Sequence, residues 1–363
     1  MPSALGRQIG QLLIAGFDGD TLPVETRALA RDFGLGGIIL FARNVKEPAQ
    51  VAELAFEAAG LSPEMPLWVS VDQEGGRVAR LKAPFTEWPP MATLGRAGDP
   101  ALARRFATAL AAELRAVGVT LDFAPVLDVH TNPKNPVIGD RALAERADLV
   151  ATLGGELIAG LQDAGVAACG KHFPGHGDTS TDSHLELPLV EHPIERLREV
   201  EFVPFREAVR REVATIMTAH VHMPALDEGV PATFSRRIVT GLLREELGYQ
   251  GVILSDDLEM KAVAASTPVP EGAVRALLAG CDGVLICSGK YDLQAQALEA
   301  LVKAVESGRL PLKWVEDALL RQRRAKERFL AASPARPAAG RTLREQLGRD
   351  EARRVADEMA RFL

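Results

Sequence analysis

The segment VAACGKHFPGHGDTSTDSH, residues Val166–His184, begins as a short apolar run and ends as a polar loop. Its first part, Val166–Lys171, is apolar at odd and even positions alike, which is typical of a parallel β-strand buried on both faces. A proline and two glycines then interrupt the run, so a loop is expected to follow. The segment therefore predicts a buried strand whose carboxyl end carries a loop rich in histidine and aspartate.

Runs of this kind recur along the chain between longer stretches with helical periodicity, which is the pattern of repeated strand–helix units. The gaps between them can hold the crossover helices that parallel strands need. The runs are Leu12–Gly16, Gly37–Phe41, Leu67–Val71, Val119–Pro125, Val166–Lys171, Ala214–Ala219, Gly251–Ser255 and Gly283–Cys287. Eight such units predict an α/β fold, a closed (β/α)8 or TIM barrel, in one catalytic domain over residues 1–332. A doubly wound open sheet is the alternative.

The end of the chain departs from this pattern. Residues 293–307 and 314–330 have helical periodicity, as do Ala101–Val117 and Ile194–Val209 earlier, and residues 333–340 then form a predicted linker. Residues 341–363 are predicted to be one amphipathic helix, a C-terminal helical extension of the barrel. Its apolar positions are Leu343, Leu347, Val355, Met359 and Phe362. They are expected to pack on the barrel wall or on a partner subunit, in a monomer or a homodimer.

Composition narrows the class of protein. The net charge of −7 comes with basic residues scattered among acidic ones, so we expect a small polar substrate and no nucleic-acid partner. No apolar run approaches the ~20 residues of a membrane span, so no membrane partner is expected. The three cysteines, Cys169, Cys281 and Cys287, lie in apolar, strand-like segments where buried unreactive thiols are common. They indicate a reducing compartment, and we expect a cytoplasmic protein.

Acidic residues follow two of the predicted strands. Reacting groups in a (β/α)8 barrel come from the carboxyl ends of strands, and Asp72 follows the third run, where it either binds a ligand or caps a helix. Asp256 and Asp257 follow the seventh run. Because neighbouring side chains on a strand point to opposite sides, only one of these two can face a ligand, and the other is expected to cap the following turn. Arg141, after the fourth run, could reach over the barrel mouth.

Asp182 and His184 stand two positions apart in the loop after the fifth run. In locally extended backbone such side chains leave the same side, so this carboxylate and imidazole are expected to hydrogen-bond. A carboxylate on one ring nitrogen fixes the tautomer and favours the protonated ring. That is what a general acid needs near neutral pH.

Metal binding is the main alternative reading of this loop, because histidine and aspartate are common ligands. The candidate ligands are His172, His176, Asp182 and His184, with a second cluster at His220 and His222. Lys171 argues against a metal, since its charge would repel a cation. A metal-dependent barrel hydrolase nevertheless stays an alternative, and His172 and His176 could instead be structural supports.

Taken together, these motifs resemble the family 3 glycoside hydrolases, in particular the NagZ-type β-N-acetylglucosaminidases. The resemblance rests on Lys171–Gly177, on the triplet Asp182-Ser183-His184 and on Ser255-Asp256-Asp257, which follow one another in the family's order. It covers roughly residues 8–330 and leaves out residues 131–136 and the segment after Ser333. It implies a (β/α)8 barrel, a double-displacement reaction, and neither a metal nor another cofactor.

The resemblance also implies roles for individual residues. Asp256, the acid directly after Ser255, would be the nucleophile, His184 the acid/base, and Asp182 the residue that orients His184. Sugar contacts are implied for Asp72, Arg80, Arg141, Lys171 and His172. The implied substrates are small: cell-wall muropeptides in peptidoglycan recycling, or chitooligosaccharides, each losing a terminal β-linked N-acetylglucosamine.

Three other reactions or functions stay open at this point. A neutral His184 would repel phosphate less than a carboxylate does, so phosphorolysis at the same site is an alternative to hydrolysis. Attack by the substrate's own acetamide often uses two adjacent acids, which Asp256 and Asp257 superficially offer, although strand alternation disfavours it. A non-catalytic sugar-binding protein would show no turnover at all.

Overall fold

The computed structural model of the chain describes residues 4–62, 65–330, 336–338 and 340–363. Eight parallel strands form a closed barrel in which each strand pairs with the next barrel strand along the chain, and the last pairs with the first. The strands are β1 Leu13–Ala15, β2 Gly37–Leu40, β3 Trp68–Val71, β6 Leu121–Asp122, β7 Ala167–Phe173, β8 Thr215–Thr218, β9 Val252–Asp257 and β10 Gly283–Ile286. Each lies in or overlaps one of the eight predicted runs, so the predicted (β/α)8 fold is confirmed.

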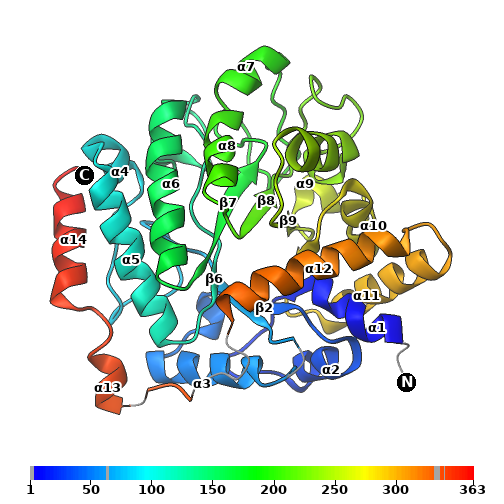
Figure 1. Cartoon of the computed structure of the whole chain (residues 1–363), viewed down its shortest axis with the longest axis horizontal. Coiled ribbons are helices and arrows are strands. Elements are labelled where there is room, and N and C mark those ends of the chain that lie inside the picture. Colours follow the sequence, from blue (N-terminus) through cyan, green and yellow to red (C-terminus); the bar gives the residue numbers. More distant parts are fainter. Residues whose placement is uncertain (1–3, 63–64, 331–335, 339) are drawn as a thin grey trace.

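Helices surround the barrel (Figure 1), and a short antiparallel hairpin, β4 Gln73–Gly75 and β5 Val78–Ala79, follows β3. The helices are α1 Ala4–Ile9, α2 Val24–Phe33, α3 Pro48–Ala59, α4 Ala92–Ala97, α5 Pro100–Ala116, α6 Ala147–Asp163, α7 Ile194–Glu199, α8 Phe202–Arg210, α9 Lys261–Ala264, α10 Val269–Ala279, α11 Tyr291–Glu306, α12 Leu312–Phe329, α13 Gly340–Arg344 and α14 Asp350–Ala360. A π-helical segment, Arg237–Glu246, lies between β8 and β9.

The barrel interior is a packed apolar core, as expected when strands bury both faces. Trp68, Phe123 and Met217 belong to the cluster of side chains that fills it. Helix α12 closes the opening at the amino ends of the strands, because Phe329 packs against the same cluster and the Trp68 indole donates to Gln322 Oε1 at 3.1 Å. The opposite end, where the strands finish, is where a (β/α)8 barrel places the polar side chains of a site.

Two predicted elements are interrupted, and proline explains both interruptions. The run Val119–Pro125 yields only the two-residue β6, because Pro125 has no N–H to donate; pairing resumes as an isolated bridge between Val126 and Lys171. The predicted helix Ile194–Val209 is divided into α7 and α8. In one continuous helix Pro204 could not donate to the carbonyl of Val200, four residues earlier.

The end of the chain packs on the barrel wall. The single helix predicted over residues 341–363 is wrong: α13 and α14 are separated by a turn at Gly348, whose φ of +53° favours glycine. Helix α14 packs against α5 and α4, and Figure 1 shows it beside α5 at the edge of the molecule. Residues 333–335 and 339 of the predicted linker 333–340 lie outside the described residues.

The cysteines behave as predicted. All three are free and buried. Burial raises the pKa of the Cys169 thiol to about 12, so it stays protonated and unreactive near neutral pH. Among the described residues, no helix combines the length and apolar character that crossing a membrane requires.

Candidate active site

The carboxyl ends of the barrel strands surround a cavity of about 280 Å³. All the side chains for which the resemblance implies a catalytic or sugar-binding role line this one cavity: Asp72, Arg80, Arg141, Lys171, His172, Asp182, His184 and Asp256. They come from β7, β9 and the segments that follow β3, β6 and β7. The topology therefore brings together residues up to 184 positions apart, as the barrel hypothesis requires.

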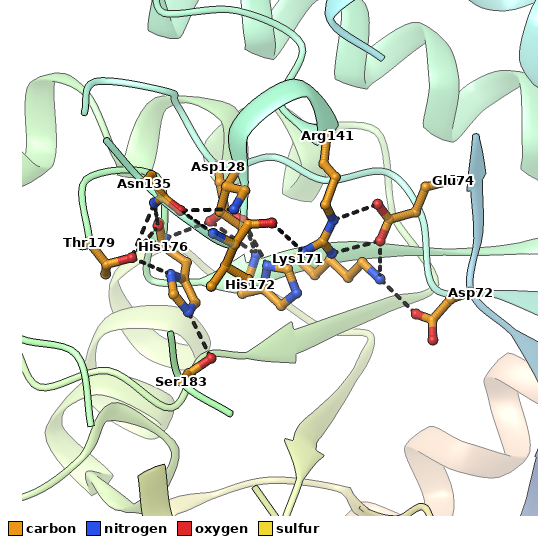
Figure 2. A network of polar contacts seen from close by, with 12 residues as sticks. Asp72, Glu74, Asp128, Asn135, Arg141, Lys171, His172, His176, Thr179 and Ser183 are labelled. Atoms are coloured by element: carbon orange, nitrogen blue, oxygen red, sulfur yellow. Dashed lines mark hydrogen bonds and ion pairs between the residues drawn. The ribbon is translucent and has the colours of Figure 1, made fainter. Parts of the chain in front are cut away.

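A buried charge network forms one wall of the cavity (Figure 2). Lys171 Nζ donates to Asp72 Oδ1 at 2.9 Å and lies 2.6 Å from Glu74 Oε1. Arg141 binds both oxygens of Glu74, with N···O distances of 2.9 and 2.8 Å, in the bidentate geometry that guanidinium and carboxylate favour. Arg80 Nη2 lies 3.3 Å from Asp72 Oδ2, so each charge in the network has an opposite partner.

These contacts set the ionisation of the network. Burial raises the pKa of Glu74, but the charges and hydrogen bonds of Arg141 and Lys171 outweigh it and hold the pKa below its usual value. Burial lowers the pKa of Lys171, but the carboxylates of Asp72 and Glu74 hold it above its usual value. Glu74 and Lys171 are thus both ionised near neutral pH. Arg80 Nε is buried without a hydrogen-bond partner among the residues that the structure describes, and a ligand oxygen could accept from it.

A second network supports two histidines that line the cavity, His172 and His176. Asp128 is fully buried, and its carboxylate lies 2.7 Å from His172 Nδ1 and accepts the His176 backbone N–H at 2.6 Å. With Nδ1 bound to the carboxylate, the other ring nitrogen of His172 is left for the cavity side. His176 is buried, with its ring nitrogens 2.7 Å from Thr179 Oγ1 and 3.0 Å from Ser183 Oγ. Burial lowers the pKa of His176 to about 4, so this ring is neutral and structural.

The predicted contact between Asp182 and His184 is present, but in a different backbone conformation. His184 Nδ1 lies 2.7 Å from Asp182 Oδ1, which also accepts the His184 backbone N–H at 2.8 Å. The backbone is a turn rather than an extended segment, since the N–H groups of Leu185 and Glu186 both donate to the Asp182 carbonyl. The carboxylate caps this turn, and capping brings it to the ring.

The pair lies where a ligand could reach it. The His184 side chain is 63% exposed, and Ser183 between the two residues is held by the buried His176 ring. Burial raises the pKa of Asp182, but hydrogen bonds from the His184 backbone and ring outweigh it and lower the pKa below its usual value. Asp182 is therefore ionised near neutral pH.

Asp256 and Asp257 both line the cavity, contrary to the expectation that only one of them faces it, but their hydrogen bonds differ. Asp257 Oδ1 accepts the backbone N–H groups of Glu259 at 3.1 Å and Cys287 at 3.2 Å, so Asp257 caps the turn after β9. Burial raises its pKa to about 7, and the nearby carboxylates of Glu259 and Asp256 add to this. Asp256 accepts only the N–H of Asp257 among the described residues, at 2.8 Å, and keeps oxygen atoms available for the cavity it lines.

The second histidine cluster points elsewhere. His220 is buried, with its ring nitrogens near Thr233 Oγ1 at 2.8 Å and the Asp257 carbonyl at 3.0 Å, and the His222 ring lies 2.7 Å from the Glu228 carbonyl. Burial lowers the pKa of His220. Over the described ranges, no three His, Cys, Asp or Glu side chains are grouped so that they could hold a metal ion.

Sequence reasoning missed three buried residues that build this site. Glu74 stands two positions after Asp72, and the same alternation used for Asp256 could have found it. Asp128 is a carboxylate inside an apolar run, which is costly without a partner. Asn135 lies in the segment that the resemblance left out. It donates to the His176 carbonyl at 2.8 Å and to Thr179 Oγ1 at 3.1 Å. No pattern in the neighbouring sequence pointed to this residue.

Comparisons with known proteins identify the family of this chain. A β-hexosaminidase from Alkalilimnicola ehrlichii is 44% identical over 282 residues, which are 76% of this chain and 80% of that protein. A family 3 β-N-acetylglucosaminidase structure from Paenibacillus is 45% identical, has a TM-score of 0.95, and the match covers 99% of this chain and 69% of that one. The NagZ structure from Neisseria gonorrhoeae is 32% identical, with a TM-score of 0.79 and 97% of each chain covered. The profile described as "Glycosyl hydrolase family 3 N terminal domain" matches residues 4–325, and the chain belongs to glycosyl hydrolase family 3.

Proposed function

We propose that this protein is a retaining β-N-acetylglucosaminidase of the cytoplasm that removes a terminal β-linked N-acetylglucosamine from small oligosaccharides. The observation that carries the proposal is that Asp256 and the Asp182–His184 pair, from different parts of the chain, line one small cavity. The names of the relatives support the sugar, and the three free, buried cysteines fit a reducing compartment.

In the first step of the proposed reaction, a carboxylate oxygen of Asp256 attacks the anomeric carbon. The glycosidic C–O bond breaks as protonated His184 gives its proton to the leaving oxygen, and a covalent glycosyl-enzyme ester forms. In the second step neutral His184 takes a proton from water, which attacks the same carbon and releases Asp256. Two inversions at the anomeric carbon retain its configuration.

The remaining residues of the cavity suit the binding of a neutral sugar. Asp72 can accept from sugar hydroxyls, while Lys171, Arg80 and Arg141 can donate to them, and the network among these side chains holds each one in place. His172 presents its second ring nitrogen from the support of Asp128. The two substrate classes implied by the resemblance, muropeptides and chitooligosaccharides, share this terminal sugar.

Trapping the intermediate tests the nucleophile. A slowly hydrolysed fluorinated N-acetylglucosaminyl fluoride should add one sugar mass to the protein, and peptide mass spectrometry should place that mass on Asp256. A label on Asp257, or none with an active enzyme, would overturn the assignment.

Leaving-group dependence tests the acid/base role. His184→Ala should slow turnover of chitobiose by about 10²–10⁴-fold. The first step should slow far less with a 4-nitrophenyl glycoside, whose leaving group needs no proton, and added azide should speed release of the sugar. Equal losses on both substrates would contradict the role.

A second assay separates hydrolysis from phosphorolysis. The reaction is carried out with and without phosphate, and the products are analysed for sugar 1-phosphate.

A further inference from the structure

The C-terminal segment, residues 340–363, lies beyond the family match, which ends at residue 325. It is joined to the barrel by a buried carboxylate. Glu113, on α5, is 3% exposed, and its Oε1 accepts the backbone N–H of Gly348 at 2.6 Å. Gly348 has little freedom to move, since a Cβ atom at this position would lie 2.6 Å from the carbonyl oxygen of Pro84. The turn between α13 and α14 is therefore closely fitted to α5 and to the chain near residue 84.

The same carboxylate holds the loop of residues 81–91, which we call the support loop. Thr86 donates to Glu113 through its backbone N–H, at 3.0 Å from Oε2, and through its hydroxyl, at 2.9 Å from Oε1. Trp88 packs edge-on against Phe106 of α5, with ring centroids 4.8 Å apart. Glu113 thus joins α5, the support loop and the C-terminal segment at one buried point.

The support loop in turn holds the part of the cavity that carries Asp72 and Arg80. The side chain of Gln73 donates to the carbonyl of Leu81 at 2.9 Å and accepts the backbone N–H groups of Arg80 and Leu81 at 2.8 and 3.0 Å. The Gly76 N–H donates to the Trp88 carbonyl at 2.8 Å. A short chain of buried contacts therefore connects Gly348 to the residues beside Arg80.

We propose that the C-terminal segment is a positioning element of the active site, with Glu113 and Gly348 as positioning residues for Asp72 and Arg80. The inference rests on the proposed sugar-binding role of those two side chains. Loss of the contact at Glu113 should let the support loop shift, and a displacement of about 1 Å at a binding group is enough to weaken binding strongly.

The test compares Glu113→Ala, Glu113→Gln and Gly348→Ala with Glu358→Gln as a matched control. Glu358 also joins α14 to α5, through Arg105 at 2.9 Å, but it lies at the surface and has no hydrogen bond to the support loop among the described residues. KM and kcat for 4-nitrophenyl N-acetylglucosaminide and the Kd of N-acetylglucosamine are measured well below each Tm. We expect Glu113→Ala and Gly348→Ala to raise KM and Kd about 5–50-fold with a smaller change in kcat, Glu113→Gln to raise them less, and the control to leave them unchanged.

Arg80→Ala, alone and combined with Gly348→Ala, separates the possible failures. If the C-terminal segment acts through Arg80, the double variant should bind the sugar no more weakly than Arg80→Ala alone, because the two substitutions then affect the same contact. If Arg80→Ala leaves KM unchanged, the proposed sugar contact fails. If Arg80→Ala raises KM while the Glu113 and Gly348 variants change only Tm, the positioning role is overturned. If the two effects add, positioning through Arg80 is overturned. Should Gly348→Ala not fold, Glu113→Gln gives the same comparison.

Discussion

Asp256 and Asp257 are neighbours of identical chemistry, and their hydrogen bonds give them different capacities. Asp257 uses an oxygen on two backbone N–H groups and is largely buried, which raises its pKa to about 7. A carboxyl group that is partly protonated and tied to a turn is a poor nucleophile. Asp256 has one backbone contact and faces the cavity. Both side chains line the cavity, so the difference follows from these hydrogen bonds and not from the residue type.

A pair of conservative variants tests this difference at the residue scale. Asp256→Asn should lower kcat by roughly 10³-fold or more, because the attacking oxygen is lost. Asp257→Asn keeps an oxygen that can accept the two backbone N–H groups, so its kcat should stay within about tenfold of the parent. Steady-state kinetics at pH 7 measure both. Comparable losses in the two variants would contradict the division of roles.

At the scale of elements, the loop after β7 is held from outside by the segment after β6. Asp128 binds the ring of His172 and the backbone of His176, and Gly177 approaches so closely that a Cβ atom there would lie 1.9 Å from the Val129 carbonyl oxygen. His176 then holds Ser183, in the turn that presents His184. The proposed acid/base is therefore exposed, but the base of its loop is fixed in the core.

Asp128→Asn tests this support. Burial raises the pKa of Asp128, but the charge and hydrogen bond of His172 and the His176 backbone outweigh it, so the folded pKa lies below the usual value. Such a group stabilises the fold above its unfolded pKa of about 3.9, and the contribution is lost as pH falls through the folded pKa. We expect Asp128→Asn to lose roughly 3 kcal/mol of unfolding free energy at pH 7. The difference in unfolding free energy between parent and variant should become smaller below pH ~4.

Denaturant unfolding of the parent and of Asp128→Asn, from pH 7 to below pH ~4, measures this difference in unfolding free energy. The control is Asp357→Asn, at an exposed position, which should have the same unfolding free energy as the parent at every pH. A difference for Asp128→Asn that stays constant down to pH ~3 would show that the ionised carboxylate is not the cause. Its activity should also fall by about 10²-fold, since His172 loses its orientation.

At the scale of the whole molecule, α12 closes the amino-terminal end of the barrel with a buried lysine. Lys326 is 2% exposed, and its Nζ donates to Gln11 Oε1 and to the Gly36 carbonyl, both at 2.7 Å. Burial lowers the pKa of Lys326 to about 7. The contacts join residues 315 and 290 positions apart, so they form only when the barrel has closed.

The stability of this closure should depend on pH. The folded pKa of Lys326, about 7, lies below the unfolded value of about 10.4, so between these values the unfolded chain binds more protons. Unfolding free energy should therefore rise with pH in this window, by up to roughly 1.4 kcal/mol per unit, in the parent relative to Lys326→Met. Chemical denaturation at pH 6.5, 8 and 9.5 measures it, with the exposed Lys303→Met as a control that should show no such slope. The prediction is refuted if the difference in unfolding free energy between the parent and Lys326→Met does not change with pH.

Local patterns were enough to predict the barrel and the residues around its mouth. Apolar runs that bury both faces mark parallel strands wherever they occur, and polar residues at their ends mark the side where chemistry can lie. This is why Asp72, Lys171, the Asp256–Asp257 pair and the Asp182–His184 pair could be named from the sequence, while the choice of Asp256 over Asp257 came from the family resemblance. The elements that were wrong, the long helix before β8 and the single terminal helix, failed at Pro204 and Gly348, where one residue overrides the periodicity.

Only the tertiary structure decided which buried partners hold those residues in place. Glu74 meets Arg141 across 67 positions, Asp128 meets His172 across 44, and Glu113 meets Gly348 across 235. A pairing of this kind leaves no periodic trace in the sequence, because its energy depends on which segments the closed barrel brings together. The amino-acid sequence by itself determined where strands end and which chemistry they carry. The geometry of that chemistry was decided by long-range contacts between charges, since a buried charge is stable only beside a partner that the fold supplies.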